Sequence, residues 1–319
     1  MRLASEMDEF LEKPREFPEK KTVLDFYFAL RNFLNIYDLV DDHYVIYSQM
    51  TEEGQFRIRL FCVDPSVNLQ KCIDKSNSTI FFSATLLPIG YYKRLLSTDE
   101  DNYAIYAQST FAQTQRLLAF GRDVSTKYTR RNRKEYEKIA DYIGAVTEAQ
   151  QGNYMVFFPS YRLMQDVYEV FAGKAADSCE ILMQHSNMKE HEREAFLEEF
   201  EKERQGTLVA FCVMGGIFGE GIDLKNDRLI GAIIVGTGLP QVSDEREILK
   251  NYYDERGLSG FDYAFRYPGM NKVLQAAGRV IRTSEDRGLI LLLDARFLPR
   301  EYGALFPSAW EKRRVCGLT

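Results

Sequence analysis

The chain has 319 residues, which at roughly 150 residues per domain suggests about two domains. Hydrophobic residues make up 45% and charged residues 28% of it, a composition that excludes a disordered chain and predicts a globular protein. The net charge of −6, from 41 basic and 47 acidic residues, argues against nucleic-acid binding over the whole surface but leaves room for a local basic groove.

Metal binding and membrane association are not expected from this sequence. The five cysteines form no C-x-x-C motif and there are only three histidines, so we predict reduced thiols and no metal site. No apolar run approaches the roughly 18 residues of a membrane span, so we expect no membrane partner. We expect a cytoplasmic protein, nucleoid-associated if bacterial. The acidic first 13 residues do not resemble a signal peptide but the middle of a helix, which suggests that the chain begins inside a longer natural protein.

The N-terminal part is predicted to be a small helix-plus-strands segment, residues 1–88. Apolar residues recur at helical intervals over residues 1–40, which predicts a helix. Three short apolar runs follow: residues 44–48, 56–63 and 79–82. The first two have the composition of strands.

From residue 89 to residue 319 the pattern changes to that of a second, α/β domain. Short apolar runs alternate with helical patterns, which predicts a mostly parallel sheet flanked by helices. The runs are residues 117–120, 154–158, 180–183, 208–213, 232–235 and 289–293. The helical patterns include residues 133–146, 162–171, 189–202 and 271–282.

Candidate site residues follow these runs, because ligands of parallel sheets bind at the carboxyl ends of the strands. Ser160 is a good N-cap, and the free amides of the helical turn after it could hold a phosphate. Four glycines at residues 215–221, beside Glu220 and Asp223, allow a backbone to approach a ligand closely. Thr237 lies in a third such place, between two glycines. Taken alone, capping explains Ser160 and a tight turn explains Thr237.

The most specific segment is residues 275–282, Gln-Ala-Ala-Gly-Arg-Val-Ile-Arg. On a helix, Gln275, Arg279 and Arg282 fall on one stripe, and two arginines with a glutamine suit a polyphosphate. Gly278 lowers helix stability by roughly 1 kcal/mol relative to alanine, which suggests that another group approaches closely there.

Together these segments resemble motifs III, IV, V and VI of superfamily-two helicases. The particular residues in them resemble those of the DinG/XPD family of DNA helicases. The segments are Ser83-Ala84-Thr85-Leu86, Phe157-Phe158-Pro159-Ser160-Tyr161, Gly219-Glu220-Gly221-Ile222-Asp223-Leu224 and residues 275–282. The resemblance covers residues 55–297 and implies a RecA-like domain. One motif alone is modest evidence, but four in order are specific.

The sequence departs from that family in one respect. It contains no G-x-x-x-x-G-K-[ST] loop, and no D-E-x-H box follows a strand. The resemblance therefore implies a C-terminal portion: residues 1–88 would end an inserted arch-like region and the first motor domain, and residues 89–319 would be the second motor domain. The first motor domain of the same polypeptide would supply the ATP-cradling loop, most ligands of Mg²⁺ and any iron–sulfur cluster.

The resemblance also implies roles for individual residues. Arg279 and Arg282 would reach the γ-phosphate of ATP, with Gln275 near the same phosphate. The residues implied to link nucleotide to DNA are Asp223, Glu220, Gly221, Ser83 and Thr85. Those implied to lie near the DNA strand are Ser160, Tyr161, Gly216 and Thr237.

The implied function is that of an ATP-dependent DNA helicase of DNA repair, which moves 5′ to 3′ on single-stranded or forked DNA. The chain alone would be inactive. An ATP-independent nucleic-acid-binding or scaffold module is the alternative; the absent phosphate loop favours it and the arginine pair argues against it. A nucleotide-cofactor enzyme would need G-x-G-x-x-G after its first strand, which is absent.

Overall fold

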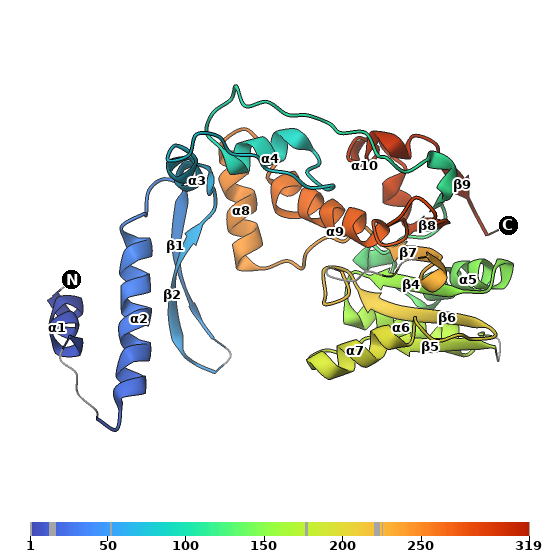
Figure 1. Ribbon diagram of the computed structural model, residues 1–319, viewed down its shortest axis with the longest axis horizontal. Helices are drawn as coiled ribbons and strands as arrows, with labels where there is room; N and C mark the ends of the chain where they lie inside the picture. The colour runs from blue at the N-terminus through green and yellow to red at the C-terminus, as the bar shows by residue number, and fades with distance from the viewer. Residues whose placement is uncertain are drawn as a thin grey trace.

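The structure, a computed structural model, describes residues 2–12, 17–51, 53–175, 178–219, 224 and 226–318. It consists of a seven-stranded sheet with its helices and an N-terminal arm of helices and a two-stranded hairpin (Figure 1). No helix among the described residues is long and apolar enough to cross a membrane.

The seven-stranded sheet has the strand order β5-β6-β4-β7-β8-β3-β9, and all its neighbouring strands pair in parallel. Its strands are β3 (Arg116–Gly121), β4 (Asn153–Phe158), β5 (Cys179–Met183), β6 (Thr207–Val213), β7 (Gly231–Val235), β8 (Gly288–Leu293) and β9 (Arg314–Cys316). The first six confirm the predicted strands. The central strands β4 and β7 are buried along their whole length, which is why their sequences are continuous apolar runs.

Helices cover both faces of this sheet. The covering helices are α5 (Arg133–Ala149), α6 (Tyr161–Ala172), α7 (Glu190–Glu198) and α9 (Tyr267–Ala277). Ile143 of α5 and Val167 of α6 pack in one core cluster with Val156 of β4. Phe196 of α7 and Val273 of α9 pack in another cluster, with residues of the opposite face of the same strands. The two clusters confirm an α/β architecture with a covered parallel sheet.

The N-terminal arm begins with two helices rather than the single predicted one. These are α1 (Arg2–Leu11) and α2 (Lys20–Tyr37), with Pro14 and Pro18 between them in the sequence. Proline removes a backbone donor and is tolerated only in the first turn of a helix, so one continuous helix cannot form.

The two predicted strands that follow form an antiparallel hairpin, β1 (Tyr44–Met50) and β2 (Phe56–Cys62). The apolar run at residues 79–82 forms no strand; Ile80 and Phe82 are 82% and 89% exposed. A strand needs a neighbouring strand to satisfy its backbone, and the described residues provide none there.

The arm is fastened to the sheet domain through a helical unit, α8 (Asp244–Glu255) and a π-helix, Asp262–Arg266, which leads into α9. Short helices α3 (Ser66–Ile73) and α4 (Ile89–Leu96) lie beside α8 in Figure 1. The Tyr253 hydroxyl donates to the Val63 carbonyl at 3.3 Å, and the Tyr91 ring lies 5.1 Å from that of Tyr263. These aromatic contacts join the arm to the helices that lead into α9.

Candidate functional site

The glycine-rich loop after β6 lies against helix α9. The Gly216 amide donates to Val213 at 3.1 Å, and the Gly219 amide donates to Gly216 at 2.8 Å, so the loop is tightly turned. Gly215 has φ +69°, and a Cβ there would lie 3.0 Å from Cε of Lys272 on α9. The backbone conformation therefore favours glycine at Gly215, and the Lys272 side chain packs closely on it.

Gln184, just after β5, connects this loop to the start of α6. Its side chain is almost fully buried; Oε1 accepts from the Val213 amide at 2.9 Å, and Nε2 donates to the Tyr161 hydroxyl at 2.9 Å. A Cβ at Gly216 would lie 3.1 Å from the same Nε2. One amide side chain thus fixes both Tyr161 and the backbone beside Gly216.

The prediction of one helix over residues 271–282 is wrong. Helix α9 ends at Ala277, and Gly278 is its C-cap, with φ −67° and ψ 0°. Gln275 lies in the last turn of the helix, whereas Arg279 and Arg282 follow it. The three residues therefore do not form a helical stripe, and Gly278 marks the end of the helix rather than a close approach within it.

Arg279 extends back to the glycine-rich loop. Its guanidinium Nη2 donates to the Gly219 carbonyl at 2.6 Å. The C-terminal end of α9 and the glycine-rich loop are therefore joined directly, through the residue types that the sequence singled out.

Arg282 is exposed, and its backbone is fixed by the buried carboxylate of Asp286. Oδ2 of Asp286 accepts from the amides of Arg282 and Thr283, each at 2.7 Å. Oδ1 accepts from the Thr283 hydroxyl at 2.8 Å and from the Asn226 amide at 2.9 Å. Burial by itself would raise the pKa of Asp286, but these hydrogen bonds outweigh burial and hold the pKa below its usual value. The carboxylate is charged at neutral pH and fixes the backbone from which the Arg282 side chain extends.

The segment with Ser83 and Thr85 is a turn, not the end of a strand. The Ser83 hydroxyl accepts from the Thr85 amide at 3.2 Å, and the two hydroxyls are 3.3 Å apart. Leu87 packs on the core cluster that includes Met214 and Leu274. The turn is thereby tied to the domain of the glycine-rich loop and α9.

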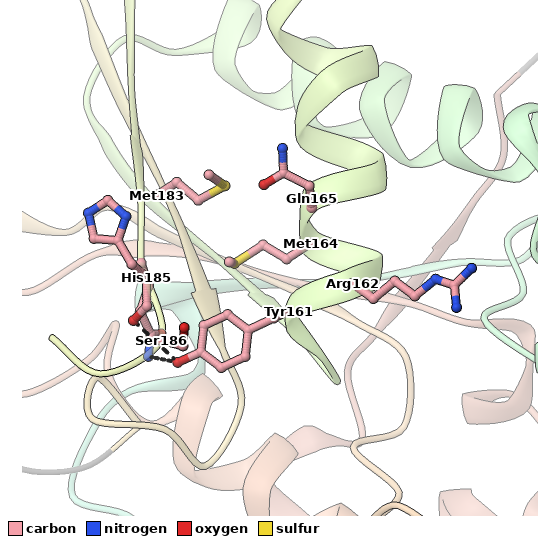
Figure 2. A pocket seen from close by; sticks show the side chains of 8 residues that line it. Tyr161, Arg162, Met164, Gln165, Met183, His185 and Ser186 are labelled. Atoms are coloured by element: carbon pink, nitrogen blue, oxygen red, sulfur yellow. Dashed lines mark hydrogen bonds between the residues drawn. The ribbon is translucent and has the colours of Figure 1, made fainter.

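Ser160 caps helix α6, as predicted: its side chain accepts from the Leu163 amide at 3.4 Å. Next to it, Tyr161 is 40% exposed at the edge of a surface depression of about 550 Å³, shown in Figure 2. The lining residues are Tyr161, Arg162, Met164, Gln165, Met183, Gln184, His185 and Ser186. The depression combines an aromatic ring, thioethers and polar groups at the carboxyl ends of β4 and β5.

Thr237 is buried in a tight turn after β7. It is 1% exposed, and within the described part of the chain its hydroxyl has no hydrogen-bond partner. Gly236 and Gly238 have φ of +82° and +64°, and a Cβ at Gly269 would lie 2.7 Å from the Thr237 carbonyl. The turn is packed against the start of α9, so a direct contact between Thr237 and a DNA strand would require the turn to move.

Three predicted site residues, Glu220, Gly221 and Asp223, lie outside the described residues. Within the described ranges no group of three or more His, Cys, Asp or Glu could hold a metal ion. The five cysteines are free thiols, and burial raises the pKa of Cys212.

Sequence reasoning missed Gln184 and Asp286, the two buried polar residues that organise the site. Gln184 directly follows strand β5, so the rule of looking after each apolar run could have found it. Asp286 sits in a loop of polar residues, and no sequence signal separates it from its exposed neighbours Ser284 and Glu285.

This fold is a RecA-like α/β domain, and comparison with known proteins gives the family. The profile of a family described as "Helicase C-terminal domain" matches residues 143–313, more than half of the chain, so the chain belongs to that family. The predicted resemblance to DinG/XPD-family helicases is confirmed.

Two curated relatives show the extent of the likeness. ATP-dependent DNA helicase YoaA of Haemophilus influenzae is 30% identical over 171 residues, 53% of this chain and 25% of that protein. The probable ATP-dependent helicase MJ0942 of Methanocaldococcus jannaschii is 25% identical over 299 residues, 88% of this chain and 43% of that protein. This chain therefore spans less than half of the length of either relative.

Solved structures support the same fold. The structure named XPD_APO has a TM-score of 0.64 and 18% identity, covering 96% of this chain and 63% of that one. At this level of identity the likeness concerns the fold, and it extends over the N-terminal arm as well as the sheet domain.

Proposed function

We propose that this chain is the second motor domain, with an adjoining arm, of an ATP-dependent DNA helicase. The central observation is the hydrogen bond from Arg279 to Gly219, which joins the arginine segment after α9 to the glycine-rich loop. A first motor domain of the same polypeptide would supply the ATP-cradling loop and most ligands of Mg²⁺. We assign residues 1–88 to the arm and the end of the first motor domain, and residues 89–319 to the second.

The chemistry of the arginine segment supports ATP hydrolysis at an interdomain cleft. Phosphoryl transfer is accelerated mainly by positioning and by neutralising charge on the transferred phosphate, and Mg²⁺ would supply part of that charge. Arg282 is an exposed residue on a backbone held by Asp286. Arg279 and Gln275, both half-buried, precede Arg282 in the sequence. The two arginines are cations that bind phosphate oxygens and cannot coordinate Mg²⁺, and the Gln275 amide can donate to a phosphate oxygen.

A chain of contacts supports coupling between ATP and DNA. Arg279 bonds to Gly219, the loop of Gly219 packs through Gly216 on Gln184, and Gln184 bonds to Tyr161. A displacement of Arg279 by the γ-phosphate would therefore reach the Tyr161 depression through three directly contacting groups. Ser83 and Thr85 would add a second link from the first motor domain.

For the DNA strand we propose a path over the start of α6. Tyr161 offers a partly exposed ring on which any base can stack, and the amides after Ser160 can meet a phosphate. Such contacts carry no base identity. Movement along one strand, 5′ to 3′ on single-stranded or forked DNA, is the activity that the resemblance implies for the whole protein.

Titration of fluorescent single-stranded oligonucleotides at several salt concentrations tests the DNA part of this proposal. The chain should bind weakly and without sequence preference, and log K should fall with log salt by about 0.7 for each phosphate contacted. Tyr161→Ala should weaken binding by roughly 5- to 150-fold, the loss of one stacked base. Tyr103→Ala, at a ring that is 99% exposed on the connector before β3, is the matched control and should bind like the unchanged chain.

Tight binding to one sequence with little response to salt would contradict the proposal. Repeating the titration with the ATP-cradling domain joined, with and without ATP, separates the alternative of an ATP-independent module, for which DNA affinity would be independent of nucleotide.

A further inference from the structure

A second basic surface lies at the carboxyl edge of the sheet, in residues 122–134, which join β3 to the first turn of α5. This basic segment contains one acidic residue, Asp123, and six basic residues, in a chain whose net charge is −6. The basic residues are Arg122, Lys127, Arg130, Arg131, Arg133 and Lys134. At its tip Lys127 and Tyr128 are exposed, and the Tyr128 ring is 81% exposed.

The basic segment is held by a buried carboxylate on each side. Oδ2 of Asp294, which directly follows β8, accepts from the Thr126 amide at 2.9 Å and from the Thr126 hydroxyl at 2.7 Å. Asp294 is 1% exposed, and Arg296 donates to both of its oxygens, at 2.9 and 2.7 Å. Burial would raise the pKa of Asp294, but the bonds from Arg296 and Thr126 lower it, so the group stays charged.

Glu135, the second carboxylate, is 4% exposed and holds the other side of the segment. Its Oε2 accepts from the Ser125 amide at 3.0 Å, and its Oε1 accepts from Arg130 at 2.6 Å. Asn132 caps α5 by accepting from the Glu135 amide at 3.2 Å. The charge of Arg130 is thus partly balanced inside the protein, whereas Lys127, between the two anchors, faces solvent.

Tyr128 and Arg131 form a small platform on this fixed backbone. The Arg131 guanidinium carbon lies 5.8 Å from the centre of the Tyr128 ring, and its Nε donates to the Thr126 carbonyl at 3.2 Å. An aromatic ring with one face open beside two cations is the combination that single-stranded nucleic acid binds: bases stack and phosphates meet the cations.

The basic segment adjoins the surface already proposed for DNA. A Cβ at Gly236 would lie 2.6 Å from the Thr126 hydroxyl, so the turn after β7 touches the segment. On the other side, burial and the neighbouring carboxylate of Asp166 raise the pKa of Tyr136 on α5, and the charges of Arg131 and Arg162 lower it. Arg162 lines the Tyr161 depression and extends away from Met183 and His185 in Figure 2. Arg131 and Arg162 are therefore both near Tyr136, which links the depression to the basic segment.

We propose that Lys127, Tyr128 and Arg131 are a second contact site for the DNA strand, continuous with Tyr161 through Arg162. Tyr128 stacks on a base, and Lys127 and Arg131 contact the flanking phosphates. This inference rests on the proposed function and extends the strand from the carboxyl end of β4 past α5 to that of β3.

Binding of the whole chain to fluorescent single-stranded DNA tests the site with three variants and one control variant. Lys127→Ala should reduce the log–log salt slope by about 0.7, the loss of one phosphate contact. Tyr128→Ala should weaken binding by roughly 5- to 150-fold, and Tyr128→Trp should retain it. Lys312→Ala removes an exposed charge just before β9, at the opposite edge of the parallel sheet, and should leave slope and affinity unchanged.

Crosslinking identifies the strand's position directly. Single-stranded DNA that contains 5-iodouracil should crosslink to Tyr128 as well as to Tyr161. Normal binding by the Tyr128 and Lys127 variants, with crosslinks at Tyr161 only, overturns the second site and leaves the proposed function intact. No binding by the unchanged chain would contradict both proposals.

Discussion

At the scale of single residues, Asp286 determines the conformation of the arginine segment. It accepts four hydrogen bonds, two of them from the amides of Arg282 and Thr283. We expect Asp286→Asn to lower the free energy of unfolding by about 1–3 kcal/mol, because its NH₂ group faces donors and leaves buried amides without acceptors. Urea unfolding measures this. The neighbouring variant Glu285→Gln, at an exposed position, should change stability little, and equal effects of the two variants would contradict the role of Asp286.

Gly236 provides a second residue-scale prediction, with Gly257 as its control. Both have positive φ, +82° and +74°, but a Cβ at Gly236 would meet the Thr126 hydroxyl at 2.6 Å whereas nothing lies within 4 Å at Gly257. Gly257→Ala should therefore cost only the backbone strain, about 1–2 kcal/mol. Gly236→Ala should cost about 1–3 kcal/mol more, because of overpacking. Equal losses in thermal or urea unfolding would mean that Thr126 and Gly236 are not in close contact.

At the scale of elements, the strands could be predicted and the end of α9 could not. Each strand from β3 to β8 is a continuous apolar run, because both faces of the sheet are covered. After Ala277 the apolar and basic residues still recur at the spacing of a helix, so the sequence predicts that the helix continues to Arg282. The structure ends the helix at Gly278, because Asp286 binds the backbone amides that a continued helix would use.

The candidate site, too, could be predicted only in part from the sequence. Ser160, the glycines and the arginines stand out by residue type and place in the sequence. Burial is not readable in that way: Thr237 is 1% exposed, and Gln184 is buried and joins two elements. The connections depend on which strands are neighbours, and β4, β6 and β7 become neighbours only in the folded sheet.

The buried carboxylates of Asp294 and Asp286 each hold a loop beside the sheet. We therefore expect the stability of the fold to decrease at acid pH. The pKa of Asp294 and that of Asp286 lie below the usual value of 3.8. A lowered folded-state pKa stabilises the fold fully above the unfolded-state value, and this stabilisation is lost as the pH falls through the folded-state value. The free energy of unfolding should therefore be nearly constant from neutral pH to about pH 5 and fall below about pH 4. Asp294→Asn should be less stable at neutral pH and show a shallower acid dependence; an unchanged dependence would contradict this account.

At the scale of the whole molecule, large apolar side chains are exposed mainly in the N-terminal arm. Phe28, Phe56, Ile80 and Phe82 are each more than 60% exposed, and Tyr103 and Ile105 form a second exposed group on the connector before β3. The family and the RecA-like fold were both expected from the order of four motifs. The sequence contains no Walker A loop, the motif that a first motor domain would supply.

The central claim is that this chain supplies arginines to an ATP site shared with a first motor domain. ATP hydrolysis by this chain joined to the proposed ATP-cradling domain tests it most directly when Arg282→Ala is compared with the unchanged protein. Arg314→Ala, at an exposed position on β9, is the matched control.

An arginine that acts in the transition state contributes on the order of 10³–10⁵ in kcat. We therefore predict that Arg282→Ala loses most single-strand-stimulated turnover while its ATP affinity stays close to that of the unchanged protein, and that Arg314→Ala retains both. Unchanged turnover in Arg282→Ala, or a loss confined to nucleotide affinity, would contradict the account.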